Sequence, residues 1–290
     1  MKKRILWLGV LAGAFLLASC SGGNKKQAAE TSETPQELDN ATEVVDYYHT
    51  SLIVLRQVAN ARDINNILKY MEQKGKVTGE SPVAPPEVSA SDSTELINSG
   101  DYFSKEVRQN LRENYRGLFK ARTQFYDNFD KYLTSLDAKD TVKMSQLLDD
   151  NYRLSVQISE YKQVIFDILA PLTEKAENEL LAGDPLKGQI MAMRKMYATV
   201  QSIMNIYARK HTMEGARIDL KMAELKKELA DAKKLPAVSG YEEEMKNYQS
   251  FLSGVESFIK DMQRARDKGK YSDEDYEAIS DTYEYGLSII

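Results

Sequence analysis

The sequence is poor in the residues that carry out most enzyme chemistry. Among 290 residues there is one cysteine, Cys20, and there are two histidines, His49 and His211. A single cysteine excludes an internal disulfide and a site built from several thiolates, and two histidines leave few acid–base candidates near neutral pH. The motifs of P-loop enzymes, dinucleotide-binding enzymes and G-x-S-x-G hydrolases are also missing. We therefore expect no catalytic residues, no cofactor and no enzymatic activity.

Long apolar runs and positive charge are also scarce. Outside residues 5–17, no run is apolar enough to cross a membrane. The chain carries 39 basic and 44 acidic residues, a net charge of −5. Three of those basic residues precede the apolar run, so the rest of the chain is more acidic still. This balance argues against nucleic acid as a partner.

The N-terminus has the composition of a secretory signal peptide. Lys2, Lys3 and Arg4 form a positive start, and the apolar run at 5–17 is too short to span a bilayer, which takes roughly 20 residues. The small residues Ala18 and Ser19 then suit a signal peptidase. We predict a signal peptide over residues 1–19.

The residues Leu17, Ala18, Ser19 and Cys20 resemble the lipobox of bacterial lipoproteins. The resemblance implies cleavage before Cys20 and attachment of a diacylglyceryl group to its sulfur, with a further acyl chain such as palmitate. Several acyl chains anchor a protein firmly in a membrane. Ser21 stands where aspartate commonly retains such lipoproteins in the inner membrane, which implies a cell-envelope location in the outer membrane, facing the periplasm.

The rest of the chain predicts a polar tether followed by helices. Residues 20–39 have too little apolar surface to fold by themselves. Residues 40–290 repeat apolar side chains every three or four positions, which is typical of packed helices. We predict an all-α, elongated antiparallel bundle of about five long helices and one short C-terminal helix. The expected segments are 40–74, 104–136, 141–183, 185–234, 239–269 and a short one from 272.

Two of these segments have additional features. Pro171 lies inside the third and should kink or end it near Ala170. The fourth, 185–234, would form a rod of about 73 Å at roughly 1.5 Å per residue, with a bend at Gly215. We expect this rod to serve as a spacer and docking surface.

Residues 76–103 interrupt the helical pattern. Pro82, Pro85 and Pro86 lie among serines, and no periodicity survives. A loop of this length is either functional or disordered. We favour a disordered surface loop over a lid above a binding site.

The weak metal candidates are His49, His211 and Glu214. Asp46 lies one helical turn before His49, and Glu214 one turn after His211, but helical metal sites need further carboxylates that do not stand out here. We therefore predict no metal site and expect packed, hydrogen-bonded histidines. Met191, Met193, Met196, Met204 and Met213 could bind Cu(I). Met193 and Met204 lie on the apolar face of the expected helix, which favours core packing.

The layout as a whole resembles the YiiG-like bacterial lipoproteins. The resemblance lies in the lipobox, the polar tether, residues 46–48 and the tyrosine-rich helical part at 126–136. It implies a helical domain with no assigned catalytic residues. We expect a lipid-anchored, non-enzymatic structural or interaction module with an unknown envelope protein as its partner. The alternative is a bundle that binds a metal or a small ligand in the periplasm.

Overall fold

A computed structural model describes residues 35–76, 89–207 and 215–268, together with several positions from 272 to 283. The signal peptide, the lipobox with Cys20, and the metal candidates His211 and Glu214 lie outside the described residues. The described part contains eight longer helices and no strand, so the predicted all-α class is confirmed. These helices are α1 (Pro35–Val58), α2 (Ala61–Glu72), α3 (Ala90–Ile97), α4 (Lys105–Asp137), α5 (Thr141–Leu180), α6 (Lys187–Tyr207), α7 (Gly215–Ala232) and α8 (Glu242–Asp267).

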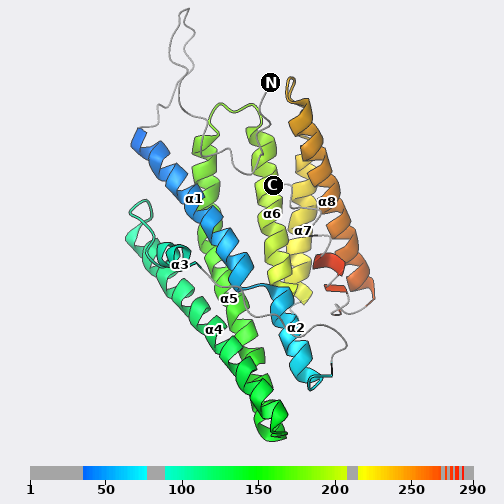
Figure 1. Ribbon diagram of the computed structural model, residues 1–290. Coiled ribbons are helices and arrows are strands. Elements are labelled where there is room, and N and C mark those ends of the chain that lie inside the picture. The colour runs from blue at the N-terminus through cyan, green and yellow to red at the C-terminus, as the bar shows by residue number, and fades with distance from the viewer. Residues whose placement is uncertain are drawn as a thin grey trace, which may run out of the picture.

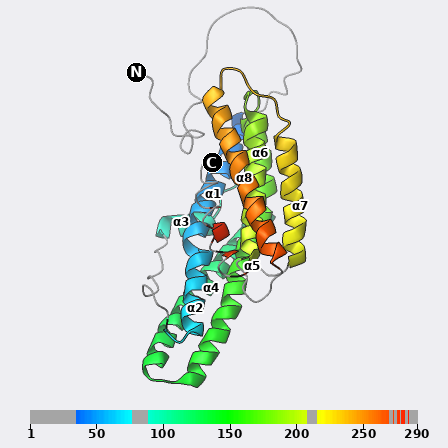
Figure 2. The same ribbon diagram turned by 90° about the vertical axis from the view of Figure 1, so that its right-hand side faces the viewer.

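The molecule is an elongated antiparallel bundle, as predicted. Helices α4, α5, α6, α7 and α8 alternate in direction along its long axis (Figure 1). Helix α5 is the central element, because it packs against α1, α2, α4 and α6. Figure 2 shows α6, α7 and α8 side by side, with the hairpin of α4 and α5 extending beyond them. None of the described helices combines the length and the low polarity that crossing a membrane requires.

The hairpin of α4 and α5 follows from local signals. The side chain of Ser104 accepts a hydrogen bond from the backbone N–H of Val107 at 3.3 Å, and Asp140 caps α5 through the N–H of Lys143 at 3.0 Å. Such caps satisfy donors that a helix end leaves unpaired. The tight turn between the helices was predicted at 137–140, and it brings α4 and α5 together along their lengths.

Helix α5 does not end near Ala170, so that part of the prediction from Pro171 is wrong. The helix continues through Pro171 to Leu180. Proline removes one backbone donor, but the residues around it are held by burial: Leu169 and Thr173 are both buried, and the Thr173 hydroxyl donates to the Leu169 carbonyl at 2.9 Å. Tertiary packing here outweighs the local preference of proline.

The first predicted helix, 40–74, is two helices. Helix α1 ends at Val58, and Asn60 caps α2 by accepting hydrogen bonds from the N–H groups of Arg62 and Asp63 at 2.9 and 3.4 Å. The break turns α2 so that Ile64, Ile67, Leu68 and Met71 are buried. Helix α1 also begins at Pro35, so residues 35–39 are helical and not part of the tether; proline suits a first helical position.

The predicted disordered loop at 76–103 is wrong for its second half. Residues 90–97 form α3, whose Leu96 is fully buried, and Phe103 is buried after it. The Tyr47 hydroxyl donates to the carbonyl of Leu96 at 2.8 Å, which ties α3 to α1. A few buried apolar side chains are therefore sufficient to order this segment, although they are too few to give a periodic pattern in the sequence.

The predicted rod at 185–234 is also wrong. Helices α6 and α7 are separate and pack side by side as an antiparallel hairpin (Figures 1 and 2). The ammonium of Lys195 on α6 lies 3.9 Å from the carboxylate of Glu228 on α7. The apolar faces of the two halves bury each other, with Val200, Ile218 and Leu225 fully buried, whereas a straight rod would leave one of those faces without this partner.

The buried side chains form two cores. The N-terminal core is built from α1 to α5, and the C-terminal core from α6 to α8 with Tyr276 and Ile279. Leu52 of α1 packs against both. The tyrosines support both cores with backbone hydrogen bonds: Tyr132 donates to Met71 at 2.6 Å and Tyr248 donates to Ala232 at 2.9 Å. Tyr132 and Tyr248 are therefore buried core residues whose polar ends are paired.

The hairpin of α6 and α7 can be tested by crosslinking. In the full chain with Cys20→Ser, the pair Lys195→Cys and Glu228→Cys should react with one short bifunctional thiol reagent, because the two side chains face each other. In a continuous rod, 33 residues at roughly 1.5 Å each would place these positions about 50 Å apart. Mass spectrometry of tryptic peptides detects the link. Either single cysteine variant serves as the control, and an unlinked double variant would contradict the hairpin.

Candidate functional site

His49 does not form a metal site in the described structure. Its ring is half-buried, and Nε2 lies 3.4 Å from Nη2 of Arg194. Burial, and then the nearby guanidinium, lower the pKa of His49, so the neutral ring is favoured. A guanidinium beside the ring would repel a metal cation. Among the described residues, no group of three or more histidine, cysteine, aspartate or glutamate side chains is placed to hold a metal.

Arg194 instead forms a largely buried ion pair that connects α5 and α6. Its Nε lies 3.2 Å from Oε1 of Glu177, which is buried. Burial raises the pKa of Glu177, and the guanidinium opposes that rise. Removing one member of such a pair leaves a buried charge alone, so the pair resists separation of the two helices.

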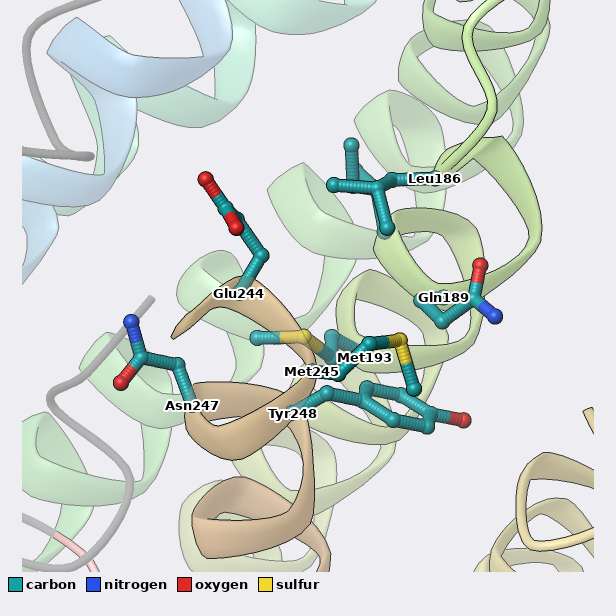
Figure 3. A pocket seen from close by; sticks show the side chains of 8 residues that line it. Leu186, Gln189, Met193, Glu244, Met245, Asn247 and Tyr248 are labelled. Atoms are coloured by element: carbon teal, nitrogen blue, oxygen red, sulfur yellow. The ribbon is translucent and has the colours of Figure 1, made fainter. Parts of the chain in front are cut away.

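The methionine cluster packs in the C-terminal core. Met193, Met196 and Met204 are buried there, and Met191 is partly buried; Met213 lies outside the described residues. Figure 3 shows the Met193 thioether beside the ring of Tyr248, with Met245 pointing away from that ring. These residues line a hollow of about 20 Å³. That volume holds about one water molecule, so this hollow is too small for an organic ligand.

A much larger cavity lies where the two cores meet. Its volume is about 370 Å³, which falls within the range of small-molecule pockets. We call it the junction cavity. Its walls come from α1, α2, α5, α6 and the C-terminal segment, and its lining residues are Leu52, Leu55, Arg56, Ala59, Asn60, Ala61, Ile64, Ser155, Ile158, Ser159, Lys162, Phe166, Tyr197, Gln201, Met204, Asn205, Tyr276, Ser280 and Tyr283.

A buried polar network fixes the wall between α5 and α6. Asn205 donates through Nδ2 to the Ser159 carbonyl and to Oε1 of Gln163, both at 3.0 Å. The Ser159 hydroxyl donates to the Asn205 carbonyl at 2.8 Å. Buried polar groups that are paired in this way hold one helix register, since any slip would leave them unsatisfied.

Two of the described lining residues of the junction cavity are cations, Arg56 and Lys162. Arg56 is exposed at its edge, and its Nη2 donates to the Tyr197 hydroxyl at 3.3 Å. Lys162 is partly buried, and its Nζ lies 3.5 Å from the carbonyl of Ala59. Burial, and then the charge of Arg56, lower the pKa of Lys162 to about 8. The described lining residues include no carboxylate, so the cavity is positively charged.

The sequence interpretation missed this site, although one signal was present. Ser155, Ser159 and Lys162 are spaced four and three apart, directly beside the apolar stripe that contains Leu154, Ile158 and Tyr161. A row of polar residues with helical spacing beside the apolar face of a helix favours a polar, solvent-accessible groove there. The partners on α1, α6 and the C-terminal segment could not be placed without the fold.

Two family models match the chain and divide it at the same place as the cores. A domain of unknown function, DUF6845, matches residues 35–183, and the C-terminal domain described as DUF3829-like matches residues 185–288. The junction cavity has walls from both matched regions. A comparison with curated proteins finds no match.

Two crystal structures from Bacteroides are similar over most of the chain. An uncharacterized DUF3829-like protein from Bacteroides thetaiotaomicron VPI-5482 is 64% identical with a TM-score of 0.77. An alpha helical protein from Bacteroides fragilis NCTC 9343 is 54% identical with a TM-score of 0.78. Each similarity covers 88% of this chain and 100% of the other. These matches support a helical domain of unknown function; the YiiG-like resemblance stays a prediction.

The stability cost of Lys162 gives a prediction. Because its pKa of about 8 lies below the usual 10.5, the charged lysine destabilises the fold below pH 8, and this cost disappears as the pH rises above 10.5. Lys162→Met should therefore raise the free energy of unfolding at pH 7 by roughly 1–3 kcal/mol, since one pKa unit is worth about 1.4 kcal/mol.

Urea unfolding of the wild type and Lys162→Met measures the difference in their free energies of unfolding. That difference should be larger at pH 7 than at pH 10.5, where the cost of the charge is mostly lost. Lys120→Met on α4 is the control, because Lys120 is exposed and its replacement should change stability by about 0.5 kcal/mol or less. A loss of stability on Lys162→Met at pH 7 would show that the ammonium holds the fold together, contrary to our interpretation.

Proposed function

The chain belongs to the DUF3829-like family of helical proteins, and we propose that it is a lipid-anchored, non-enzymatic binding protein of the cell envelope. The lipid on Cys20 attaches it to the outer membrane, with the helical part facing the periplasm. Its ligand is a small molecule held in the junction cavity. The predicted small-ligand alternative is thereby preferred to docking of an envelope protein partner.

The junction cavity is the observation that carries this proposal. It combines apolar walls, including Leu55, Ile64 and Phe166, with convergent polar groups such as Tyr197 and Gln201. That mixture is typical of small-molecule sites, in which apolar surface gives affinity and a few polar groups fix orientation. Its position between two cores is also common for ligand sites.

The surface gives less support to docking of a protein partner. The rod at 185–234 that was expected to present a docking surface is a packed hairpin. The exposed large hydrophobic residues in the described structure are distributed over three helices: Leu38, Ile53, Val142, Val164 and Leu220. Single exposed apolar residues are normal for soluble domains, whereas interaction sites usually present a contiguous patch.

The chemistry of the lining supports binding without catalysis. Among its described residues there is no histidine, cysteine or carboxylate to take up and return a proton. Lys162 is mostly protonated at neutral pH, because its pKa of about 8 lies above 7. General acid–base catalysis would require a second positioned group with a complementary pKa.

Lipid attachment at Cys20 is tested by metabolic labelling. Cells given an alkyne fatty acid should label the wild-type chain, and Cys20→Ala should remove the label, because only the thiol can accept the diacylglyceryl group. Gel fluorescence after click chemistry measures it, and Ser21→Ala is the matched control that should keep the label. Equal labelling of Cys20→Ala and wild type would rule out the anchor.

Ligand binding in the cavity is tested by a thermal-shift screen of the full chain against small organic acids, amides, sugars and nucleosides. At least one class should raise the melting temperature of the wild type, since a ligand that binds only the folded state stabilises it. Ser155→Phe, which fills the cavity, should abolish that shift. Ser253→Phe on the exposed face of α8 should retain it. A shift that survives Ser155→Phe would place the ligand elsewhere.

A further inference from the structure

The charged and polar donors of the junction cavity find few acceptors within the described part of the protein. A guanidinium has five N–H donors and an ammonium has three, and neither group can accept a hydrogen bond. With the described residues, Arg56 makes one hydrogen bond, to the Tyr197 hydroxyl. No carboxylate among the described residues lies within ion-pair distance of Arg56 or Lys162, although other lysines and arginines in the chain have such partners.

Lys162 has a partial structural explanation that does not account for its charge. Its Nζ lies 3.5 Å from the carbonyl of Ala59, just beyond the C-terminal end of α1, where a cation is favourable. That distance is at the outer limit for a hydrogen bond and involves one of three donors. A neutral side chain would avoid the cost of placing a second cation near Arg56.

Two tyrosine hydroxyls add further donors. The Tyr197 hydroxyl accepts from Arg56 and from Nε2 of Gln201 at 2.9 Å, so its own hydrogen is left to donate. The rings of Tyr197 and Tyr283 stack with centroids 6.1 Å apart. No described residue forms a well-aligned hydrogen bond with the buried Tyr283 hydroxyl. Burial, and then the Tyr197 hydroxyl close by, raise the pKa of Tyr283, so its hydroxyl keeps its proton.

We propose that the ligand of the junction cavity is a small organic anion whose oxyanion group, a carboxylate or phosphate, is bound by Arg56 and Lys162. Tyr197 and Tyr283 donate to the same group. An oxyanion accepts hydrogen bonds and donates none. It would supply both the acceptors and the negative charge that Arg56 and Lys162 lack within the described part of the cavity. The inference rests on the proposed function, because it assigns a class to the ligand of that same site.

The apolar walls define the other end of this ligand. Leu55 of α1, Ile64 of α2 and Phe166 of α5 line the cavity together with the cations. A volume of about 370 Å³ exceeds what a bare inorganic ion fills. An aromatic or aliphatic group attached to the oxyanion would occupy this space and gain from apolar burial.

The test compares two probes of nearly equal size and different charge. The full chain, extracted in a non-ionic detergent, is titrated calorimetrically with 4-phenylbutyrate and with its neutral amide, 4-phenylbutyramide. The carboxylate should bind at least about tenfold more tightly, because charge-assisted hydrogen bonds are roughly twice as strong as neutral ones. Phenyl phosphate and inorganic phosphate form the second pair, and the organic anion should again bind more tightly.

Variants then assign the effect to the two cations. Arg56→Gln and Lys162→Met should each weaken binding of 4-phenylbutyrate by on the order of tenfold or more, and should leave the amide unchanged. Arg116→Gln and Lys120→Met are matched exposed controls on α4 and should behave as wild type. Circular dichroism before titration confirms that each variant is folded.

The outcomes separate this inference from the proposed function. If the amide binds as tightly as the carboxylate and Ser155→Phe abolishes both, the cavity binds a ligand without charge recognition, and only the inference falls. If inorganic phosphate binds as tightly as the organic anions, the apolar part of the proposal is wrong. If no anion binds at millimolar concentration, the inference is overturned, and the thermal-shift screen alone decides the proposed function.

Discussion

The contact between α5 and α6 is the constraint on which the rest of the structure depends. Helix α5 belongs to the N-terminal core and α6 to the C-terminal core, and they meet through the polar network of Ser159, Gln163 and Asn205 and through the pair of Glu177 and Arg194. Apolar contacts alone tolerate small shifts of one helix along another. Buried polar groups do not, because each shift leaves a donor or acceptor unsatisfied in a low-dielectric interior.

This fixed register explains how the junction cavity can hold charge. Lys162 lies one residue before Gln163 on α5, so the network that locks the helix also positions the ammonium. A cation kept partly buried near Arg56, with its pKa lowered, destabilises the protein in isolation. Proteins commonly accept such costs at binding sites, where the ligand supplies the missing partner. The same residues are therefore unfavourable for folding and suited to the proposed recognition of an anion.

The comparisons agree with the division of the molecule into two cores. The two family matches meet between residues 183 and 185, which is the turn from α5 into α6. Relatives with 64% and 54% identity extend across both regions with TM-scores of 0.77 and 0.78, so both cores occur together in them.

The sequence by itself determined the helical class and several helix ends, because these depend on local physics. Val200 and Met204 are buried as the three- and four-residue spacing predicted. Helix α4 begins after Ser104, and the connection to α5 lies between the two expected segments. Only the tertiary structure decided which apolar faces meet. It separated α1 from α2 at Asn60, ordered α3 through Leu96, carried α5 through Pro171 and folded α7 back on α6. It also assembled the junction cavity, because Arg56, Lys162 and Tyr283 lie far apart in the chain, and no periodicity encodes contacts between distant segments.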